Sequence, residues 1–177
     1  ENDLIAQKNR EFFAKNNILT VNIMGSPGCG KTSLIEALIK KLKNKFKIAV
    51  IEGDIATSKD TIRIKKLNIP VVQINTDKFG NACHLSSKMV NRTLRSLSHV
   101  KFNILFIENI GNLVCPSEFD LGEALRVSIT SVSEGDDKVS KYPPMFANSD
   151  VIIISKTDVI PYFKYNLKEV EKDIKRI

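Results

Sequence analysis

The fold is decided by the stretch at residues 18–42, which reads ILTVNIMGSPGCGKTSLIEALIKKL. Residues 18–24 alternate in the manner of a strand, and the glycines that follow mark a turn. From Lys31 onward, apolar residues recur on one face of a helix, at Leu34, Ile35, Leu38, Ile39 and Leu42. The stretch therefore predicts a strand, a glycine-rich turn and a helix that begins near Lys31.

Within this stretch, residues 25–32 satisfy the pattern G-x-x-x-x-G-K-S/T at every fixed position. In such a loop the glycines let backbone N–H groups face a phosphate, the lysine reaches the β- and γ-phosphates, and the threonine hydroxyl binds Mg²⁺. We expect nucleotide contacts, and for Lys31 also a catalytic role, from Gly28, Cys29, Gly30, Lys31, Thr32 and Ser33. Cys29 is expected to act as a small spacer rather than as a nucleophile.

Outside this stretch, apolar runs predict strands at residues 47–51, 71–74, 104–107, 127–132 and 151–154. The first 16 residues are expected to contain a leading helix, at residues 3–16. Further helices are expected at residues 84–97 and 169–177. Apolar runs without clean alternation, separated by helical segments, favour an α/β fold with a mostly parallel sheet between layers of helices. No repeat or linker divides residues 1–177, so one domain is expected.

The composition excludes several classes of protein. The chain has 177 residues, a formal net charge of +7 and three cysteines, which are too few for a secreted disulfide framework. No apolar run approaches the roughly 20 residues of a membrane-spanning helix. The densest lysines stand at the end of a predicted helix, where they complement its dipole. We therefore expect a cytoplasmic protein with neither a nucleic-acid nor a membrane partner.

Two carboxylates follow predicted strands at the edge where the phosphate loop should lie. The strand at 104–107 ends in Glu108, with Gly111 three residues later, which resembles the GTPase element D-x-x-G with Glu in place of Asp. We expect Glu108 to act on the Mg²⁺ shell or the attacking water, and the Gly111 N–H to face the γ-phosphate. Asp54 is a second candidate for Mg²⁺ binding and catalysis, and a plain turn carboxylate is the alternative reading.

The last predicted strand runs into Ser155-Lys156-Thr157-Asp158, a variant of the guanine-reading N-K-x-D element. Asp158 is expected to accept hydrogen bonds from guanine N1–H and its exocyclic amine, with the Lys156 stem against the ring. Ser155 in place of Asn removes one stabilising amide. The predicted nucleotide is GTP or GDP.

A second candidate site consists of Cys83, His84 and Cys115. Thiolate and imidazole suit Zn²⁺ or Ni²⁺, but neighbouring Cys and His side chains are expected to diverge, and three ligands leave a tetrahedral site incomplete. Two chains meeting about a two-fold axis would supply a complete set. On the residues alone, a metal site and buried cysteines beside an ordinary histidine both remain open.

The chain resembles the HypB family, the nickel-related maturation GTPases of NiFe-hydrogenase. The resemblance extends over nearly the whole chain and rests on the phosphate loop and on residues 83–85, 108–116, 119–123, 134–138 and 141–143. It implies a P-loop NTPase of the SIMIBI type. The urease relatives carry a Cys-Pro-His metal element, which this sequence lacks.

The resemblance implies a nucleotide-dependent homodimer that holds Ni²⁺ or Zn²⁺ at positions matching Cys83, His84 and Cys115, with the hydrogenase large subunit and other nickel maturation proteins as partners. Slow hydrolysis is expected, because Asn112 stands where many small GTPases keep a water-orienting glutamine and no arginine finger is evident. Lys138 and Lys141 are candidates for nucleotide contact across the dimer, with a solvated basic loop as the alternative.

Three competing functions remain at this point: a urease-type nickel accessory GTPase, a metal store with incidental hydrolysis, and a small-molecule kinase. The kinase reading requires an arginine-rich lid, and the arginines here are scattered. Beyond Asp158 a GTPase domain is expected to add one more strand and a final helix, and residues 169–177 resemble a helix on the way to that strand. The C-terminal part of the domain is therefore expected to be missing or incomplete.

Overall fold

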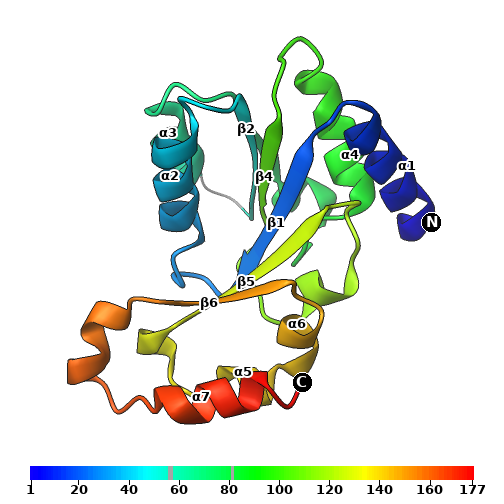
Figure 1. Ribbon diagram of the computed structural model, residues 1–177. Helices are drawn as coiled ribbons and strands as arrows, with labels where there is room; N and C mark the ends of the chain where they lie inside the picture. The colour runs from blue at the N-terminus through cyan, green and yellow to red at the C-terminus, as the bar shows by residue number, and fades with distance from the viewer. Residues whose placement is uncertain (56–57, 81) are drawn as a thin grey trace.

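The computed structural model describes residues 1–55, 58–80 and 82–177, which form a six-stranded sheet. The strands are β1 Leu19–Gly25, β2 Ile48–Asp54, β3 Val71–Asn75, β4 Ile104–Glu108, β5 Leu125–Ser131 and β6 Val151–Ser155. Their order is β3-β2-β4-β1-β5-β6, and each of these pairings is parallel. The strand that leads into the phosphate loop, β1, therefore lies inside the sheet, between β4 and β5 (Figure 1).

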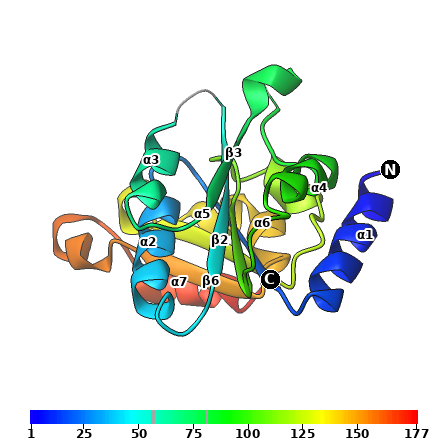
Figure 2. The same cartoon turned by 90° about the horizontal axis from the view of Figure 1, so that it is seen from above.

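Helices cover both faces of the sheet. They are α1 Asn2–Lys15, α2 Lys31–Leu42, α3 Lys59–Lys65, α4 Ser87–Ser96, α5 Lys138–Lys141, α6 Pro143–Ala147 and α7 Leu167–Ile174. Figure 2 shows α2 and α3 on one side of β2, and α1 and α4 on the other. Within the described residues, no helix has the length and apolar character that a bilayer crossing requires.

Two cores follow from the alternation of side chains along β2. Ile48 and Val50 face the core under α2 and α3, whereas Ala49 and Ile51 face the core under α4 and α1. Because both faces of the strand are covered, its residues form a continuous apolar run rather than an alternating one. The predicted parallel sheet between helical layers is confirmed.

A third core lies under the C-terminal helices. Met24 at the end of β1 packs with Val139 of α5, Phe146 of α6 and Val170 of α7. This core holds the segments after β5 and β6 against the strand that precedes the phosphate loop. The segment with the predicted guanine reader is thereby attached to the same sheet edge.

The predicted strands are confirmed to within two residues at each end, except that β2 continues to Asp54. The predicted helix at 84–97 was wrong at its start, because α4 begins at Ser87 and leaves Cys83 and His84 in an irregular segment. Helix α3, seven residues long, was not predicted. Seven residues of mixed charged and apolar character are too few to show a clear helical periodicity.

Candidate nucleotide and metal sites

The phosphate loop joins the carboxyl end of β1 to the first turn of α2. Gly30 stands at the N-cap of α2 with a φ of 107°, a backbone conformation that other residues rarely adopt. Lys31 donates from Nζ to the carbonyl oxygens of Gly25 and Ser26, each at 3.2 Å. The ammonium group thus lies over the loop, where phosphate oxygens can replace the two carbonyls as its partners.

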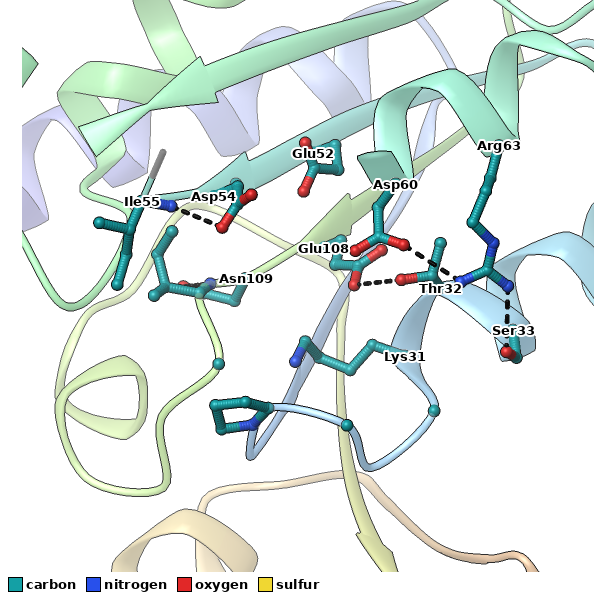
Figure 3. A pocket seen from close by; sticks show the side chains of 16 residues that line it. Lys31, Thr32, Ser33, Glu52, Asp54, Ile55, Asp60, Arg63, Glu108 and Asn109 are labelled. Carbon is teal, nitrogen blue, oxygen red and sulfur yellow. Dashed lines mark hydrogen bonds and ion pairs between the residues drawn. The ribbon is translucent and has the colours of Figure 1, made fainter. Parts of the chain in front are cut away.

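A cavity of about 430 Å³ opens beside the loop. Its walls come from the loop, the end of β2, α3 and the segment after β4 (Figure 3). Predicted site residues among its lining are Gly28, Gly30, Lys31, Thr32, Ser33, Asp54, Glu108 and Gly111. The structure therefore brings the phosphate-binding and Mg²⁺-binding parts of the predicted set together.

Glu108 and Thr32 form the polar centre of this cavity. The Thr32 hydroxyl donates to Glu108 Oε1 at 2.8 Å, whereas the buried Glu108 Oε2 has no hydrogen-bond partner among the described residues. Burial raises the pKa of Glu108 to about 7, although the nearby Lys31 ammonium opposes the shift. An unsatisfied carboxylate oxygen beside a hydroxyl suits a hard divalent cation, so these residues fit Mg²⁺.

Asp54, the other predicted Mg²⁺ ligand, lies at the end of β2 and is half-buried. Its Oδ1 accepts a hydrogen bond from the Ile55 N–H at 2.7 Å. In the view of Figure 3, Asp54 and Glu108 both lie above Lys31. The two carboxylates and the lysine thus face one cavity from different elements.

A third carboxylate, Glu52, was not predicted. It is paired with Glu108 in the register of β2 and β4, is 2% exposed, and accepts a hydrogen bond from Thr61 Oγ1 at 2.8 Å. Burial raises the pKa of Glu52 to about 7, the Thr61 hydroxyl opposes the shift, and Glu108 adds to it. Extending the predicted strand at 47–51 to Asp54 would have placed these two glutamates side by side.

An arginine also lines the cavity, although the sequence showed no arginine finger. Arg63 on α3 donates to Glu36 at 2.7 Å, to Asp60 at 3.1 Å and to Ser33 Oγ at 3.2 Å. Figure 3 shows the guanidinium group beside Ser33, with a further bond toward Asp60. These bonds join α3 to α2 and hold the Asp60 carboxylate at the cavity wall.

The predicted base-reading residues lie apart from this cavity, at the end of β6. Ser155 Oγ donates to the carbonyl oxygen of Cys29 at 2.5 Å, so the serine ties this segment to the phosphate loop. Lys156 has a φ of 55° and donates to Ser133 Oγ at 3.2 Å, and Asp158 is exposed. Cys29 is fully buried, in keeping with a spacer role.

Cys83, His84 and Cys115 form one cluster, in which a ligand atom from each lies within 4.8 Å of the others. The expectation that the adjacent Cys83 and His84 side chains diverge was wrong, because Cys83 Sγ lies 3.8 Å from His84 Nδ1. Neither residue belongs to a helix or strand, so no regular geometry forces the two side chains apart.

Burial and neighbouring groups change the protonation of two members of the cluster, His84 and Cys115. His84 stacks on Phe119 with ring centroids 3.6 Å apart, and burial lowers the pKa of His84, which favours the neutral imidazole that binds metals. A hydrogen bond with Cys83, together with burial, raises the pKa of Cys115. Binding of a metal ion would therefore have to displace the proton of the Cys115 thiol.

Lys138 and Lys141 both have partners within the chain. Lys141 forms an ion pair with Asp137, and the Lys138 Nζ lies 5.9 Å from the centre of the Tyr142 ring. The preceding Glu134 bonds to Ser26 of the phosphate loop. The segment that carries the two lysines is thus attached to the loop.

A strand–loop–helix of this geometry, with a buried carboxylate bonded to the threonine hydroxyl, defines a P-loop nucleotide-binding protein. The parallel sheet between helical layers is that of the SIMIBI class.

The profile of the CobW/HypB/UreG nucleotide-binding domain matches residues 19–177. The hydrogenase maturation factor HypB of Rhizobium leguminosarum bv. viciae is 46% identical over 166 residues, which are 94% of this chain and 54% of that protein. The probable hydrogenase maturation factor HypB of Methanocaldococcus jannaschii is 42% identical over 99% of this chain and 78% of that protein. A crystal structure of HypB from Helicobacter pylori in complex with nickel has a TM-score of 0.92 at 40% identity, covering 99% of this chain and 81% of that chain.

The chain therefore belongs to the CobW/HypB/UreG family and, within it, to the HypB proteins. It spans about half the length of the Rhizobium relative, 54%.

Proposed function

We propose that residues 1–177 form a single GTPase domain that couples GTP binding and hydrolysis to nickel handling in hydrogenase maturation. The observation that carries this proposal is that one short segment, from Gly111 to Cys115, contacts both the phosphate loop and the cluster. At its start Gly111 packs so closely on the phosphate loop that an added Cβ would lie 2.9 Å from the Pro27 nitrogen. Four residues later, Cys115 belongs to the cluster with Cys83 and His84.

The phosphate end of the site supports binding of a nucleoside triphosphate. Lys31 exchanges the carbonyls of the loop for phosphate oxygens, and the N–H groups at the start of α2 add donors. Thr32, Asp54 and Glu108 would hold Mg²⁺, whose charge neutralises the β- and γ-phosphates when it is bound.

The hydrolysis that we propose is attack of water on the γ-phosphorus. A new bond forms from the water oxygen to phosphorus, and the bond from phosphorus to the β-phosphate oxygen breaks, which releases GDP and phosphate. Glu108 lines the cavity where the water would lie, so it is our candidate to orient it. We expect the reaction to be slow, because the Asn112 amide donates to Cys115 Sγ instead of lining the cavity.

Guanine selection is assigned to Asp158 and Lys156. A carboxylate accepts from the N1–H and exocyclic amine of guanine together, and adenine offers no such pair. Ser155 supports this assignment, because its bond to the Cys29 carbonyl holds the segment beside the phosphate loop.

The metal we propose for the cluster is Ni²⁺, with Zn²⁺ as the competing ion. Two thiols and one imidazole suit both ions, and three ligands leave the set incomplete. A nucleotide-dependent homodimer, with Lys138 and Lys141 near the partner's nucleotide, would supply further ligands across a two-fold axis. The proposed recipients are the hydrogenase large subunit and other nickel maturation proteins in the cytoplasm.

The experiment that tests this function measures nickel affinity and stoichiometry on the reduced protein, with GDP and with a non-hydrolysable GTP analogue. Molecular mass is recorded in the same samples. We expect nickel binding and mass both to change with the nucleotide, because the segment from Gly111 to Cys115 contacts both sites. Single-turnover assays with GTP and Mg²⁺ should release phosphate.

Two variants complete this experiment. His84→Ala is expected to abolish the nickel response, whereas His99→Ala, at the other histidine of the chain, should preserve it. Identical nickel binding in both nucleotide states would contradict coupling and leave a GTPase with a separate metal site. The absence of phosphate release would favour a metal store.

A further inference from the structure

Two asparagines on either side of Gly111 bond to different halves of the metal cluster. Asn109 bonds to the segment that carries Cys83 and His84, whereas Asn112 bonds to Cys115. Both asparagines lie in the segment after β4, and Glu108, the last residue of β4, bonds to Thr32 in the nucleotide cavity. The segment after β4 therefore contacts the nucleotide cavity and both halves of the cluster.

The half with Cys83 and His84 is anchored to the centre of the sheet. Asn109 is 1% exposed, and its Oδ1 accepts from the Leu85 N–H at 3.1 Å, directly after His84. Its Nδ2 donates at 3.2 Å to Asn22 of β1, which is itself fully buried. Leu85 is also fully buried and lies against Gly53 of β2. These contacts hold this half to elements that are packed on both faces.

The half with Cys115 is connected to the phosphate loop instead. The Asn112 backbone N–H donates at 3.2 Å to the Gly25 carbonyl, the same oxygen that accepts from Lys31 Nζ. The Asn112 side chain accepts from the Val114 N–H at 2.8 Å and donates to Cys115 Sγ at 3.5 Å. One residue thus contacts both the carbonyl that Lys31 occupies and the thiol of the cluster.

We infer that Asn112 is a positioning residue that couples the occupancy of the phosphate loop to the position of the Cys115 sulfur, while Asn109 holds Cys83 and His84 in place. The inference rests on the proposed function and adds the residue that carries the coupling. When phosphate oxygens bind the Lys31 ammonium group, the Gly25 carbonyl loses its hydrogen bond from Lys31. It then keeps the hydrogen bond from the Asn112 N–H. The change reaches Cys115 through Asn112 and bypasses the half that Asn109 anchors.

The amide donor also acts on the sulfur directly. The hydrogen bond from Nδ2 holds Cys115 Sγ in position relative to the other two candidate ligands. Outer hydrogen bonds of this kind change metal affinity by about 10-fold to 100-fold when they are removed. Asn112 is therefore expected to set nickel affinity as well as its dependence on nucleotide.

The test uses Asn112→Asp, which keeps an oxygen to accept from the Val114 N–H but removes the donor to sulfur. Asn112→Ser is a second variant without added charge. The matched control is Asn103→Asp, because the Asn103 Oδ1 likewise accepts a backbone N–H, that of Lys47 at 3.2 Å, and Asn103 precedes β4, at the opposite end of the strand. Nickel affinity is measured with GDP and with a non-hydrolysable GTP analogue, alongside the thiolate-to-nickel charge-transfer absorption.

We expect both Asn112 variants to weaken nickel binding by about 10-fold and shift the charge-transfer band. We also expect the ratio of nickel affinities between the two nucleotide states to fall toward one, with GDP affinity preserved. Asn103→Asp should match the wild type. If the ratio and the band stay unchanged in both Asn112 variants while the wild type responds to nucleotide, the inference is overturned and the proposed function stands. A wild type without any nucleotide response would overturn both.

Discussion

The phosphate loop and the candidate metal cluster differ in how the chain builds them. The loop is one run of eight residues, 25–32, whose lysine bonds to carbonyls five and six positions away. The cluster combines Cys83 and His84 with Cys115, from segments that precede α4 and follow β4. The loop therefore depends on local backbone conformation, whereas the cluster depends on the packing of distant elements.

The helix α1 shows what holds the cluster segments together. Asn9, fully buried, donates to the carbonyls of Ser87 at 3.0 Å and Leu121 at 2.9 Å, and it accepts from Asn91 on α4. One of these carbonyls belongs to the start of α4, and the other follows the Cys115 segment. Helix α1 thus bonds to residues that flank both candidate metal-binding segments.

The largest expected effect is a loss of GTP affinity that leaves the candidate metal cluster unchanged. Lys31→Ala removes two charged hydrogen bonds to phosphate, so we expect GTP affinity to fall roughly 1000-fold, about 4 kcal/mol. Nickel stoichiometry in the absence of nucleotide should stay unchanged. Isothermal titration calorimetry checks both values, and Lys40→Ala on the exposed face of the same helix is the control. A parallel loss of the nickel site would mean that the two regions are not separately built.

The next effect should weaken the cluster through α1. Asn9→Ala leaves two buried carbonyls without their donor, so we expect the free energy of unfolding to fall by about 3 kcal/mol. Nickel affinity should fall while GTP affinity remains. Urea unfolding and nickel titration measure these changes, with the exposed Gln7→Ala on the same helix as the control. An unchanged nickel affinity would show that α1 stabilises the fold without organising the cluster.

The dependence of stability on pH tests the carboxylates of the nucleotide cavity. Glu52 and Glu108 have pKa values of about 7, against 4.5 for an ordinary glutamate, so between these values the folded state holds protons that the unfolded state has released. The free energy of unfolding should therefore fall as pH rises through this window.

Glu52→Gln should remove about 2 kcal/mol of this pH dependence, because an uncharged side chain has no proton to lose. Urea unfolding of the nucleotide-free protein at pH 5.5 and pH 8 measures it. Glu11→Gln, on the exposed face of α1, should leave the slope as in the wild type. If Glu52→Gln keeps the full wild-type dependence of the free energy of unfolding on pH, groups other than Glu52 are responsible for it.

The smallest expected effect concerns the bond between the predicted base-reading segment and the phosphate loop. Ser155→Ala removes the donor to the Cys29 carbonyl, so we expect GDP to bind about five-fold more weakly, about 1 kcal/mol. Calorimetric titration with GDP measures it, and Ser98→Ala at an exposed hydroxyl is the control. Unaltered GDP affinity would show that the serine does not position the guanine-binding residues.

Features that depend on local sequence were predicted correctly, whereas features that depend on the packing of distant elements were missed. The strands and the phosphate loop were predictable, because apolar runs and a contiguous pattern identify them. The burial of Glu52 was missed, since it depends on β2 continuing to Asp54 in register with β4. The cavity contact of Arg63 was missed because α3 is short and charged.

The candidate metal ligands were identified, but their convergence was not predicted. Regular geometry would separate the adjacent side chains of Cys83 and His84, and only the irregular segment before Ser87 turns both toward Cys115. The contact of Asn112 with Cys115 Sγ was likewise invisible, because the interpretation of that position came from its place after Gly111 alone.

The sequence by itself determined the phosphate loop and the parallel α/β sheet, because the contacts that define them lie within a few residues or repeat with a regular period. Only the tertiary structure decided that two glutamates share one cavity and that two thiols and an imidazole meet at one point. Strand register and the packing of α1 against α4 bring these groups together, and such long-range contacts leave no local pattern in the chain.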